Sequence, residues 1–257
     1  MNIFTAAVLG LTQGLTEFLP VSSSGHLVVL QHYLKVPEAG VTFDVFLHFA
    51  TLLAVVVYFR ADLRALLRDR RRLLLLLAGS VPAGLAGVAL EGLFTRLFSS
   101  VLAVGVALIG TGFILWGAER LAASYRDRRA AEQMTVADAW WVGVAQAVAI
   151  IPGISRSGAT IATGLARGLE RETAARFSFL LSIPVILGAT VLQLRHLPAG
   201  SFLESAPLVV GFLAAFLSGL AAIWLLLGVV RRRHLTIFSW YVWALGAATI
   251  AAALGGP

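Results

Sequence analysis

Six apolar stretches, each about long enough to cross a lipid bilayer as a helix, constrain this chain more than any other feature. A hydrocarbon core of about 30 Å needs roughly 20 helical residues, and backbone polar groups inside it must be satisfied internally. The stretches cover residues 41–59, 73–91, 100–118, 177–194, 206–230 and 237–254. They predict an all-α polytopic membrane protein, in which 1–257 form a single membrane domain.

The composition excludes a water-soluble fold. Apolar residues make up 59% of the chain, charged residues make up 13%, and the mean hydropathy is +0.88. A soluble protein of this kind would expose large apolar patches to water. The absence of cysteine also rules out thiolate metal sites and a cysteine nucleophile.

The net charge of +7 reflects membrane topology rather than nucleic-acid binding. Most of the 20 basic residues fall in the breaks between apolar stretches, at 60–72, 119–135, 167–176 and 231–233. Six spans place all four breaks on one side, which the positive-inside rule assigns to the cytoplasm. Both chain termini are then expected outside.

Two further apolar segments, 3–34 and 138–169, are interrupted in the middle by Pro, Ser and Gly residues, at 20–26 and 152–158. The helix on each side of the break is shorter than the roughly 20 residues needed to span the bilayer core. Non-helical backbone at membrane depth is tolerated only inside protein or beside a wet cavity. We therefore predict two re-entrant helical hairpins in addition to the six spans.

The two broken segments also resemble each other at a fixed offset. The residues that match are Gly10 with Gly143, Gln13 with Gln146, Ser22 with Ser155, Ser24 with Ser157, and Gly25 with Gly158. Each hairpin is followed by three spans, and an odd number of spans inverts the second unit in the membrane. This predicts an inverted-topology repeat, with one unit at about 1–120, a cytoplasmic loop at about 119–135, and the second unit at about 136–257.

Polar side chains within the breaks are the candidate site. Gln13 and Glu17 share one helical face, and a serine-rich break followed by a new helix offers hydroxyls and free backbone N–H groups to an anion. Arg156 suits bidentate phosphate binding. The candidates are Gln13, Glu17, Ser22, Ser23, Ser24, Gly25 and His26 in the first hairpin, and Ser155, Arg156, Ser157, Gly158 and Thr160 in the second. Together they are typical of phosphoryl transfer.

Structural interpretations stand beside this one. Ser24 and Ser157 are equally well explained as close-packing residues. A buried pair of Glu17 and Arg156 can serve only to brace the hairpins. His48 is interpreted first as a hydrogen-bonded interior residue, and Asp44 as an interfacial one.

The two motifs resemble those of the bacterial undecaprenyl-pyrophosphate phosphatases, also called bacitracin-resistance proteins. The first motif is Gln13 and Glu17 followed by Pro20 to His26, and the second runs from Pro152 to Thr160. The resemblance extends over nearly the whole chain. It implies a bacterial inner-membrane enzyme, open to the outer face, that removes the terminal phosphate from a polyprenyl diphosphate. That reaction recycles the lipid carrier of peptidoglycan synthesis and gives bacitracin resistance.

The resemblance also implies roles and a cofactor. Glu17 and Gln13 are expected to bind a divalent cation, Mg²⁺ or Ca²⁺. Many family members carry Glu at the position of Gln13, and an amide is the weaker ligand. Arg156 and the serines of the second break are expected to hold the diphosphate. The nucleophile is left open between His26, Ser23 and water, and a homodimer is left open as well.

Two other functions fit parts of the sequence. A lipid-phosphate transporter or flippase would use the same inverted repeat and an arginine for its anion, but it has no need of a nucleophile beside a base. A structural scaffold would need no convergence of these polar groups.

The topology gives the first prediction. Accessible tags at residues 1 and 257 should both react with a membrane-impermeant reagent from outside, and a tag within 60–72 should react only after the membrane is opened. A chain whose two ends lie on opposite sides would contradict both the charge argument and the inverted repeat.

Overall fold

A computed structural model describes residues 1–34, 36, 41–125, 127–194, 206–231 and 235–255, which fold almost entirely into helices. Lys35, Arg126, Arg195, Arg232 and Arg233, which entered the charge argument, and the C-terminal Pro257 lie outside the described residues. The helices are α1 (Ile3–Phe18), α2 (Ser23–Tyr33), α3 (Val41–Tyr58), α4 (Arg60–Leu66), α5 (Arg70–Ala89), α6 (Glu91–Phe98), α7 (Val101–Ser124), α8 (Val136–Val148), α9 (Arg156–Ala166), α10 (Arg171–Leu194), α11 (Ala206–Arg231) and α12 (Thr236–Leu254). A single 3₁₀ turn covers Ala131–Gln133, and the described part of the chain contains no strand longer than an isolated bridge. The all-α prediction is confirmed.

Five of these helices, α5, α7, α10, α11 and α12, are long and apolar enough to cross a membrane. A sixth candidate appears if α3 is joined to α4 across their 75° bend. The five long helices and α3 overlap the six predicted apolar stretches, and the protein is therefore a multi-pass membrane protein. Large apolar side chains face outward from them, among them Leu85, Phe113 and Trp224, which are 65%, 58% and 69% exposed. In a bilayer that surface contacts lipid.

The helices begin where the sequence supplies a capping side chain. Asn2 accepts a hydrogen bond from the backbone N–H of Thr5 at the start of α1, and Asp69 caps α5 in the same way. Ser100 caps α7, and Thr135 forms a reciprocal capping box with Asp138 at the start of α8. Each cap satisfies N–H groups that would otherwise lack partners.

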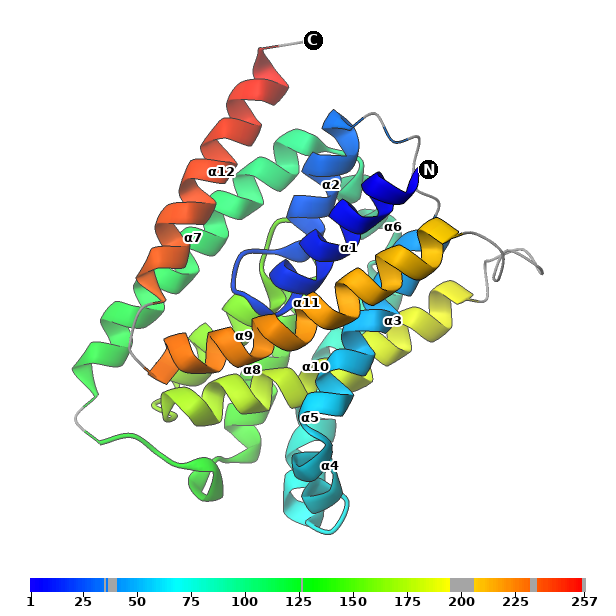
Figure 1. Cartoon of the computed structure of the whole chain (residues 1–257). Coiled ribbons are helices and arrows are strands. Elements are labelled where there is room, and N and C mark those ends of the chain that lie inside the picture. Colours follow the sequence, from blue (N-terminus) through cyan, green and yellow to red (C-terminus); the bar gives the residue numbers. More distant parts are fainter. Residues whose placement is uncertain (35, 37–40, 126, 195–205, 232–234, 256–257) are drawn as a thin grey trace.

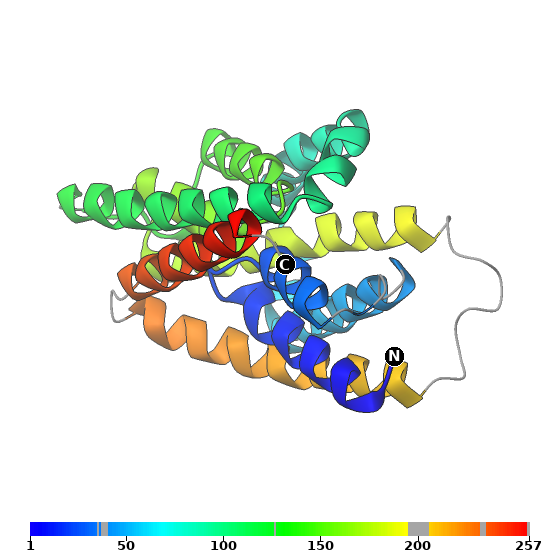
Figure 2. The same cartoon turned by 90° about the horizontal axis from the view of Figure 1, so that it is seen from above.

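Close helix pairs involve both broken segments. α1 lies along α11, and α8 lies along α5. Glycine permits both contacts: a Cβ at Gly10 would lie 2.2 Å from the carbonyl oxygen of Gly211, and a Cβ at Gly143 would lie 2.2 Å from that of Gly79. α7 and α12 form another long pair, and Figures 1 and 2 show them side by side.

The ends of the chain and its arginine-rich segments lie at opposite sides of the molecule. In Figure 1 the start of α1 and the end of α12 point toward the top, whereas α4 and the green loop between α7 and α8 lie at the bottom. Arg129 and Arg167 clamp that loop by pairing with the buried carboxylate of Asp138, at 2.7 and 2.8 Å. Which of these two ends faces the cytoplasm stays a prediction.

Two short helices were not predicted. Residues 60–66 were interpreted as part of a polar break, yet they form α4, whose arginines alternate with Leu63 and the buried Leu66. α6 similarly fills the short connection between α5 and α7. Both are single amphipathic segments that gain their order by packing against neighbouring spans, and so lack a strong signal of their own.

The glycine contacts give a second prediction. Gly143→Ala places a methyl group against the backbone of α5, and we expect a loss of about 1–3 kcal/mol from overpacking, seen as a lower melting temperature in detergent. Gly84→Ala on α5 is the matched control, because a Cβ there meets nothing within 4 Å. Equal melting temperatures for the two variants would contradict the close packing of α5 and α8.

Candidate active site

The two breaks touch each other within the molecule. The Ser157 hydroxyl, in the first turn of α9, donates to the carbonyl oxygen of Leu19 at 3.0 Å. Arg156 of the second break donates to Glu17 at the end of α1, with 2.6 Å between Nη2 and Oε1. Segments separated by more than half the chain are thus joined by a hydrogen bond and an ion pair.

The first break turns sharply before α2 begins. Ser22 has a φ of +70° and is the only described residue other than glycine with positive φ. Its hydroxyl accepts a hydrogen bond from the Gly25 N–H at 3.3 Å, and its carbonyl accepts one from the His26 N–H at 3.2 Å. Strained backbone of this kind persists where surrounding contacts hold it, and it is often found at functional sites.

The second break repeats this local pattern. Ser155 caps α9 by accepting a hydrogen bond from the Gly158 N–H at 3.1 Å, and its hydroxyl lies 3.2 Å from that of Ser157. In the first break the hydroxyls of Ser22 and Ser24 are 3.3 Å apart. Equivalent serines therefore begin equivalent helices.

Glu17 is the centre of the polar contacts at the junction. It is only 7% exposed. Its Oε2 accepts a hydrogen bond from the Ser23 hydroxyl at 2.6 Å and another from Gln13 Nε2 at 2.9 Å, while its Oε1 faces Arg156. One carboxylate oxygen therefore accepts a hydrogen bond from a hydroxyl, and the other pairs with a guanidinium.

Arg156 retains donor capacity. Its side chain is 14% exposed, and only Nη2 is engaged by Glu17. Nη1 is buried and has no hydrogen-bond partner among the described residues. An anion that reached Nη1 would satisfy this group, and a phosphate oxygen matches its geometry and charge.

His26 is fixed through both ring nitrogens. Nδ1 lies 2.7 Å from the carbonyl oxygen of Ser22, so it carries the proton, and Nε2 lies 2.8 Å from the hydroxyl of Tyr241 on α12. The two rings stack at a centroid distance of 5.7 Å. In the neutral ring Nε2 then accepts a hydrogen bond from the Tyr241 hydroxyl.

Several predicted binding residues already have partners inside the protein. Ser157 bonds to Leu19 as described, and the buried Thr160 hydroxyl donates to the Arg156 carbonyl at 2.7 Å and lies 2.6 Å from Ser178. Ser155, Gly25 and Gly158 are occupied in the helix caps. These groups shape the breaks, and their contact with substrate stays a prediction.

Three residues near the junction were missed or undervalued. His48 on α3 lies with Nδ1 3.0 Å from Gln13 Nε2 and 3.7 Å from Glu17 Oε2. Thr111 on α7 donates to the Gly153 carbonyl and accepts from the Ser155 N–H, at 2.8 and 2.9 Å. Tyr241 lies beside His26. Of the three, only His48 carried a sequence signal for a site residue, because it is a histidine inside an apolar span. Thr111 and Tyr241 have no such signal, since tertiary packing alone brings them to the junction.

The oxygen donors fit a weak site for a hard cation. Gln13 Oε1 is buried and lacks a partner among the described residues, and it belongs to a side chain that touches Glu17. A carboxylate and an amide oxygen are the kind of ligand that Mg²⁺ takes, and few protein ligands suffice because Mg²⁺ usually keeps several waters and binds substrate phosphates. Within the described residues there is no cluster of three or more His, Asp or Glu side chains that would bind a metal alone.

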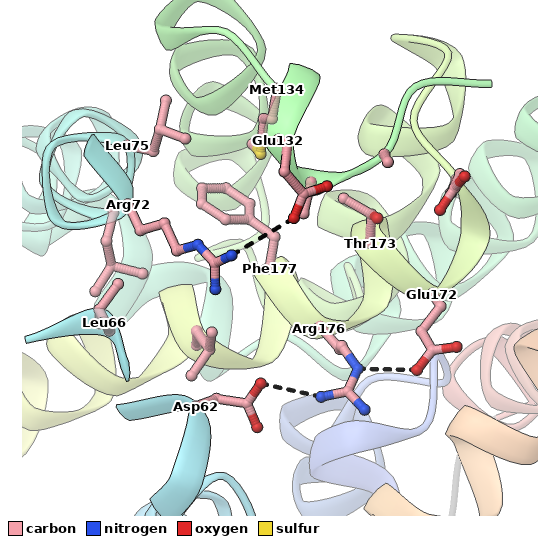
Figure 3. Close-up of a pocket in the computed structure, with 15 residues that line it drawn as sticks. Asp62, Leu66, Arg72, Leu75, Glu132, Met134, Glu172, Thr173, Arg176 and Phe177 are labelled. Atoms are coloured by element: carbon pink, nitrogen blue, oxygen red, sulfur yellow. Dashed lines mark hydrogen bonds and ion pairs between the residues drawn. The ribbon is translucent and has the colours of Figure 1, made fainter. Parts of the chain in front are cut away.

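A cavity of about 340 Å³ lies away from this junction, beside α4, α5 and α10. Figure 3 shows that its arginines are already paired: Arg176 with Asp62 and Glu172, at 3.0 and 2.9 Å, and Arg72 with Glu132 at 3.5 Å. Because these charges are neutralised by neighbours, the cavity lacks the free cation that a diphosphate needs.

Comparison with known proteins gives the same family as the motifs. The family model described as "Bacitracin resistance protein BacA" matches residues 6–248. The chain belongs to this family. It is 48% identical over 257 residues to a protein of Carboxydothermus hydrogenoformans named undecaprenyl-diphosphatase, covering 96% of this chain and 95% of the relative. It is 46% identical to the protein of the same name from Syntrophotalea carbinolica, covering 96% and 97%.

Arg156 supplies the third prediction. Arg156→Lys keeps the positive charge but loses the planar fork, and we expect a fall in phosphate release of about 100-fold or more, as for loss of a donor aimed at a transition state. Arg96→Lys, which alters an arginine on the short helix α6, is the control. Near-normal hydrolysis by Arg156→Lys would remove Arg156 from the phosphate site.

Proposed function

We propose that this protein hydrolyses undecaprenyl diphosphate to undecaprenyl phosphate and inorganic phosphate. The observation that carries the proposal is the contact between the breaks, where a hydroxyl, a carboxylate and an arginine with a free nitrogen lie together. The names of its close relatives and its family membership support the same activity. The product is the lipid carrier of peptidoglycan synthesis, and its recycling accounts for the bacitracin resistance in the family's name.

Ser23 is the nucleophile in this proposal. Its hydroxyl already donates to Glu17 at 2.6 Å, the arrangement of a nucleophile with its base. The Ser23 oxygen attacks the terminal phosphorus while its proton passes to Glu17, and the bond from that phosphorus to the bridging oxygen breaks. Water then attacks the phosphoserine, the bond from phosphorus to the Ser23 oxygen breaks, and the proton held by Glu17 returns to that oxygen as inorganic phosphate leaves. His26 takes the proton of the attacking water in this proposal, once its Nε2 has released the Tyr241 hydroxyl.

Arg156 holds the phosphate. Nη1 is available while Nη2 remains on Glu17, so the guanidinium can bind substrate without releasing the hairpins from each other. A divalent cation, Mg²⁺ or Ca²⁺, would be held by Glu17 and by the free oxygen of Gln13. When bound it would offset charge on the diphosphate.

The membrane arrangement is part of the proposal. Six spans with α1–α2 and α8–α9 as re-entrant hairpins give two inverted units. The paired contacts of α1 with α11 and of α8 with α5, each made through glycine, support this, as do the matching serine caps. The protein then lies in the bacterial inner membrane with the site opening to the periplasm or exterior.

A transporter on the same fold is the alternative, and the Ser23–Glu17 bond argues against it. A carrier for a lipid phosphate needs a cation for the headgroup, but a serine hydroxyl bonded to a carboxylate contributes nothing to carriage.

The fourth prediction tests the catalytic role of Glu17 in purified protein. Glu17→Gln removes the base and should lower phosphate release from undecaprenyl diphosphate by about 10²–10⁴-fold. Gln13→Ala should be milder, and Gln13→Glu should retain activity at lower cation concentration, because a second carboxylate favours a divalent ion. Cation titrations and a melting temperature accompany each variant. If Glu17 only braces the hairpins, Glu17→Gln will melt earlier yet keep the wild-type rate and cation response.

A further inference from the structure

Thr111 of α7 forms two hydrogen bonds to the second break, and both are to backbone groups. Its hydroxyl donates to the Gly153 carbonyl oxygen at 2.8 Å and accepts from the Ser155 N–H at 2.9 Å. A hydroxyl can do both because it carries one proton and two lone pairs. These two bonds, called the Thr111 bridge below, tie the residues on either side of Ile154 to a neighbouring helix.

A threonine inside a helix often turns its hydroxyl back to its own helix. Thr249 on α12 does so, donating to the Leu245 carbonyl oxygen at 2.8 Å. Thr111 instead directs its hydroxyl to another segment, where the Gly153 carbonyl and the Ser155 N–H have no other partner within the described part of the chain. All three residues are buried. Loss of the hydroxyl would therefore leave a buried donor and a buried acceptor unsatisfied, which is costly.

The Thr111 bridge lies where α7 and the two breaks come together. Gly153 has a φ of +97°, and a Cβ there would lie 2.5 Å from the carbonyl oxygen of Val104 on α7. On the side of the first break, a Cβ at Gly25 would lie 3.3 Å from the Cα of Gly153. Only glycine allows the second break to approach α7 so closely with this backbone conformation. The bridge thus holds the second break at the point where the first break packs on it.

Arg156 follows Ser155 directly and is the first residue of α9. The backbone at this point sets the direction in which the side chain leaves the helix, and so where Nη2 meets Glu17 and where the buried Nη1 points. The body of α9 is held separately, since the Thr160 hydroxyl lies 2.6 Å from that of Ser178 on α10. Without the Thr111 bridge, the start of α9 would shift while the rest of the helix stays in place.

We propose that Thr111 is a positioning residue of the reaction, which holds the second break so that Arg156 reaches Glu17 and the substrate phosphate together. This inference rests on the proposed function, in which Arg156 binds that phosphate. Thr111 touches neither the substrate nor the reacting atoms in this arrangement, and it acts only through the backbone. Misplacing a group by an ångström can lower a rate by about 10²-fold, so one fixed turn of backbone is enough to govern a single guanidinium.

The test compares Thr111→Val with Thr111→Ser in the full-length protein in detergent, by phosphate release from undecaprenyl diphosphate. Valine has nearly the shape of threonine but cannot form the bridge, and we expect kcat/KM to fall about 10–100-fold. Serine supplies the same donor and acceptor, so Thr111→Ser should retain most of the activity. Thr249→Val is the matched control, because Thr249 is a buried threonine whose hydroxyl bonds within its own helix.

A double-mutant cycle separates positioning from stability. Once Arg156→Lys has removed the planar fork, Thr111→Val has little left to misplace, and the double variant should have a kcat/KM within about threefold of Arg156→Lys alone. A role in stability alone would lower both proteins by the same factor. Inhibition by inorganic phosphate gives a second comparison that needs no turnover by Arg156→Lys: the inhibition constant should rise in Thr111→Val and stay unchanged in Thr249→Val. All assays are made below the lowest melting temperature of the set.

The outcomes are separable. A loss in Thr111→Val that Thr111→Ser avoids, with weaker inhibition by phosphate, supports the positioning role. Full activity of Thr111→Val, a loss that multiplies with that of Arg156→Lys, or an unchanged inhibition constant overturns it. If Thr111→Val melts too early to assay, Thr111→Cys takes its place in every comparison, because a thiol is a weak donor and acceptor. Failure of the wild type itself to release phosphate would instead overturn the proposed function.

Discussion

The ion pair between Glu17 and Arg156 is the interaction on which the rest of the structure depends. It joins the end of α1 to the start of α9 at 2.6 Å, with both side chains largely buried. Charges at such depth are costly unless they are paired and hydrogen-bonded, and removing one partner leaves the other stranded. The pair therefore fixes the contact between the breaks. In the proposed function the structural brace and the reaction centre are the same contact, which is why stability and activity must be measured together.

The breaks themselves follow from the membrane setting. Unpaired backbone groups are hard to tolerate inside a bilayer, so each helix that ends there needs local partners. Ser22 and Ser155 supply them, each accepting the N–H of the glycine three residues ahead. Ser22 makes this cap with a positive φ, whereas Ser155 makes it with a φ of −72°. The backbone N–H groups that remain free at a helix start are also what makes it an anion-binding place.

Much of this was predictable because the membrane imposes simple rules. Span length located the five long helices and α3, and the two motifs located the residues that meet at the junction. A bracing contact between Glu17 and Arg156 was predicted as an alternative to catalytic roles for these residues. The observed arrangement of the two side chains is compatible with both interpretations. His48 and Tyr241 were not identified as site residues, because nothing near them in sequence tells which face of α3 or α12 meets the hairpins. The extra helices α4 and α6 depend on tertiary packing in the same way.

Comparison of the two hairpins explains why one site forms rather than two. Gln13 and Gln146 are equivalent and both fully buried, yet Gln13 bonds to Glu17 and His48 while neither amide atom of Gln146 has a partner among the described residues. The reason lies one turn further on, where the second hairpin has Ile150 in place of Glu17. Within the break itself the charged residue is on the second hairpin, which has Arg156 where the first has Ser23. Each hairpin thus contributes what the other lacks: the first gives the Ser23 hydroxyl and the Glu17 carboxylate, and the second gives the Arg156 guanidinium. Neither hairpin alone brings together the nucleophile, base and phosphate-binding group that the proposed reaction requires, so the site arises only where the two breaks meet.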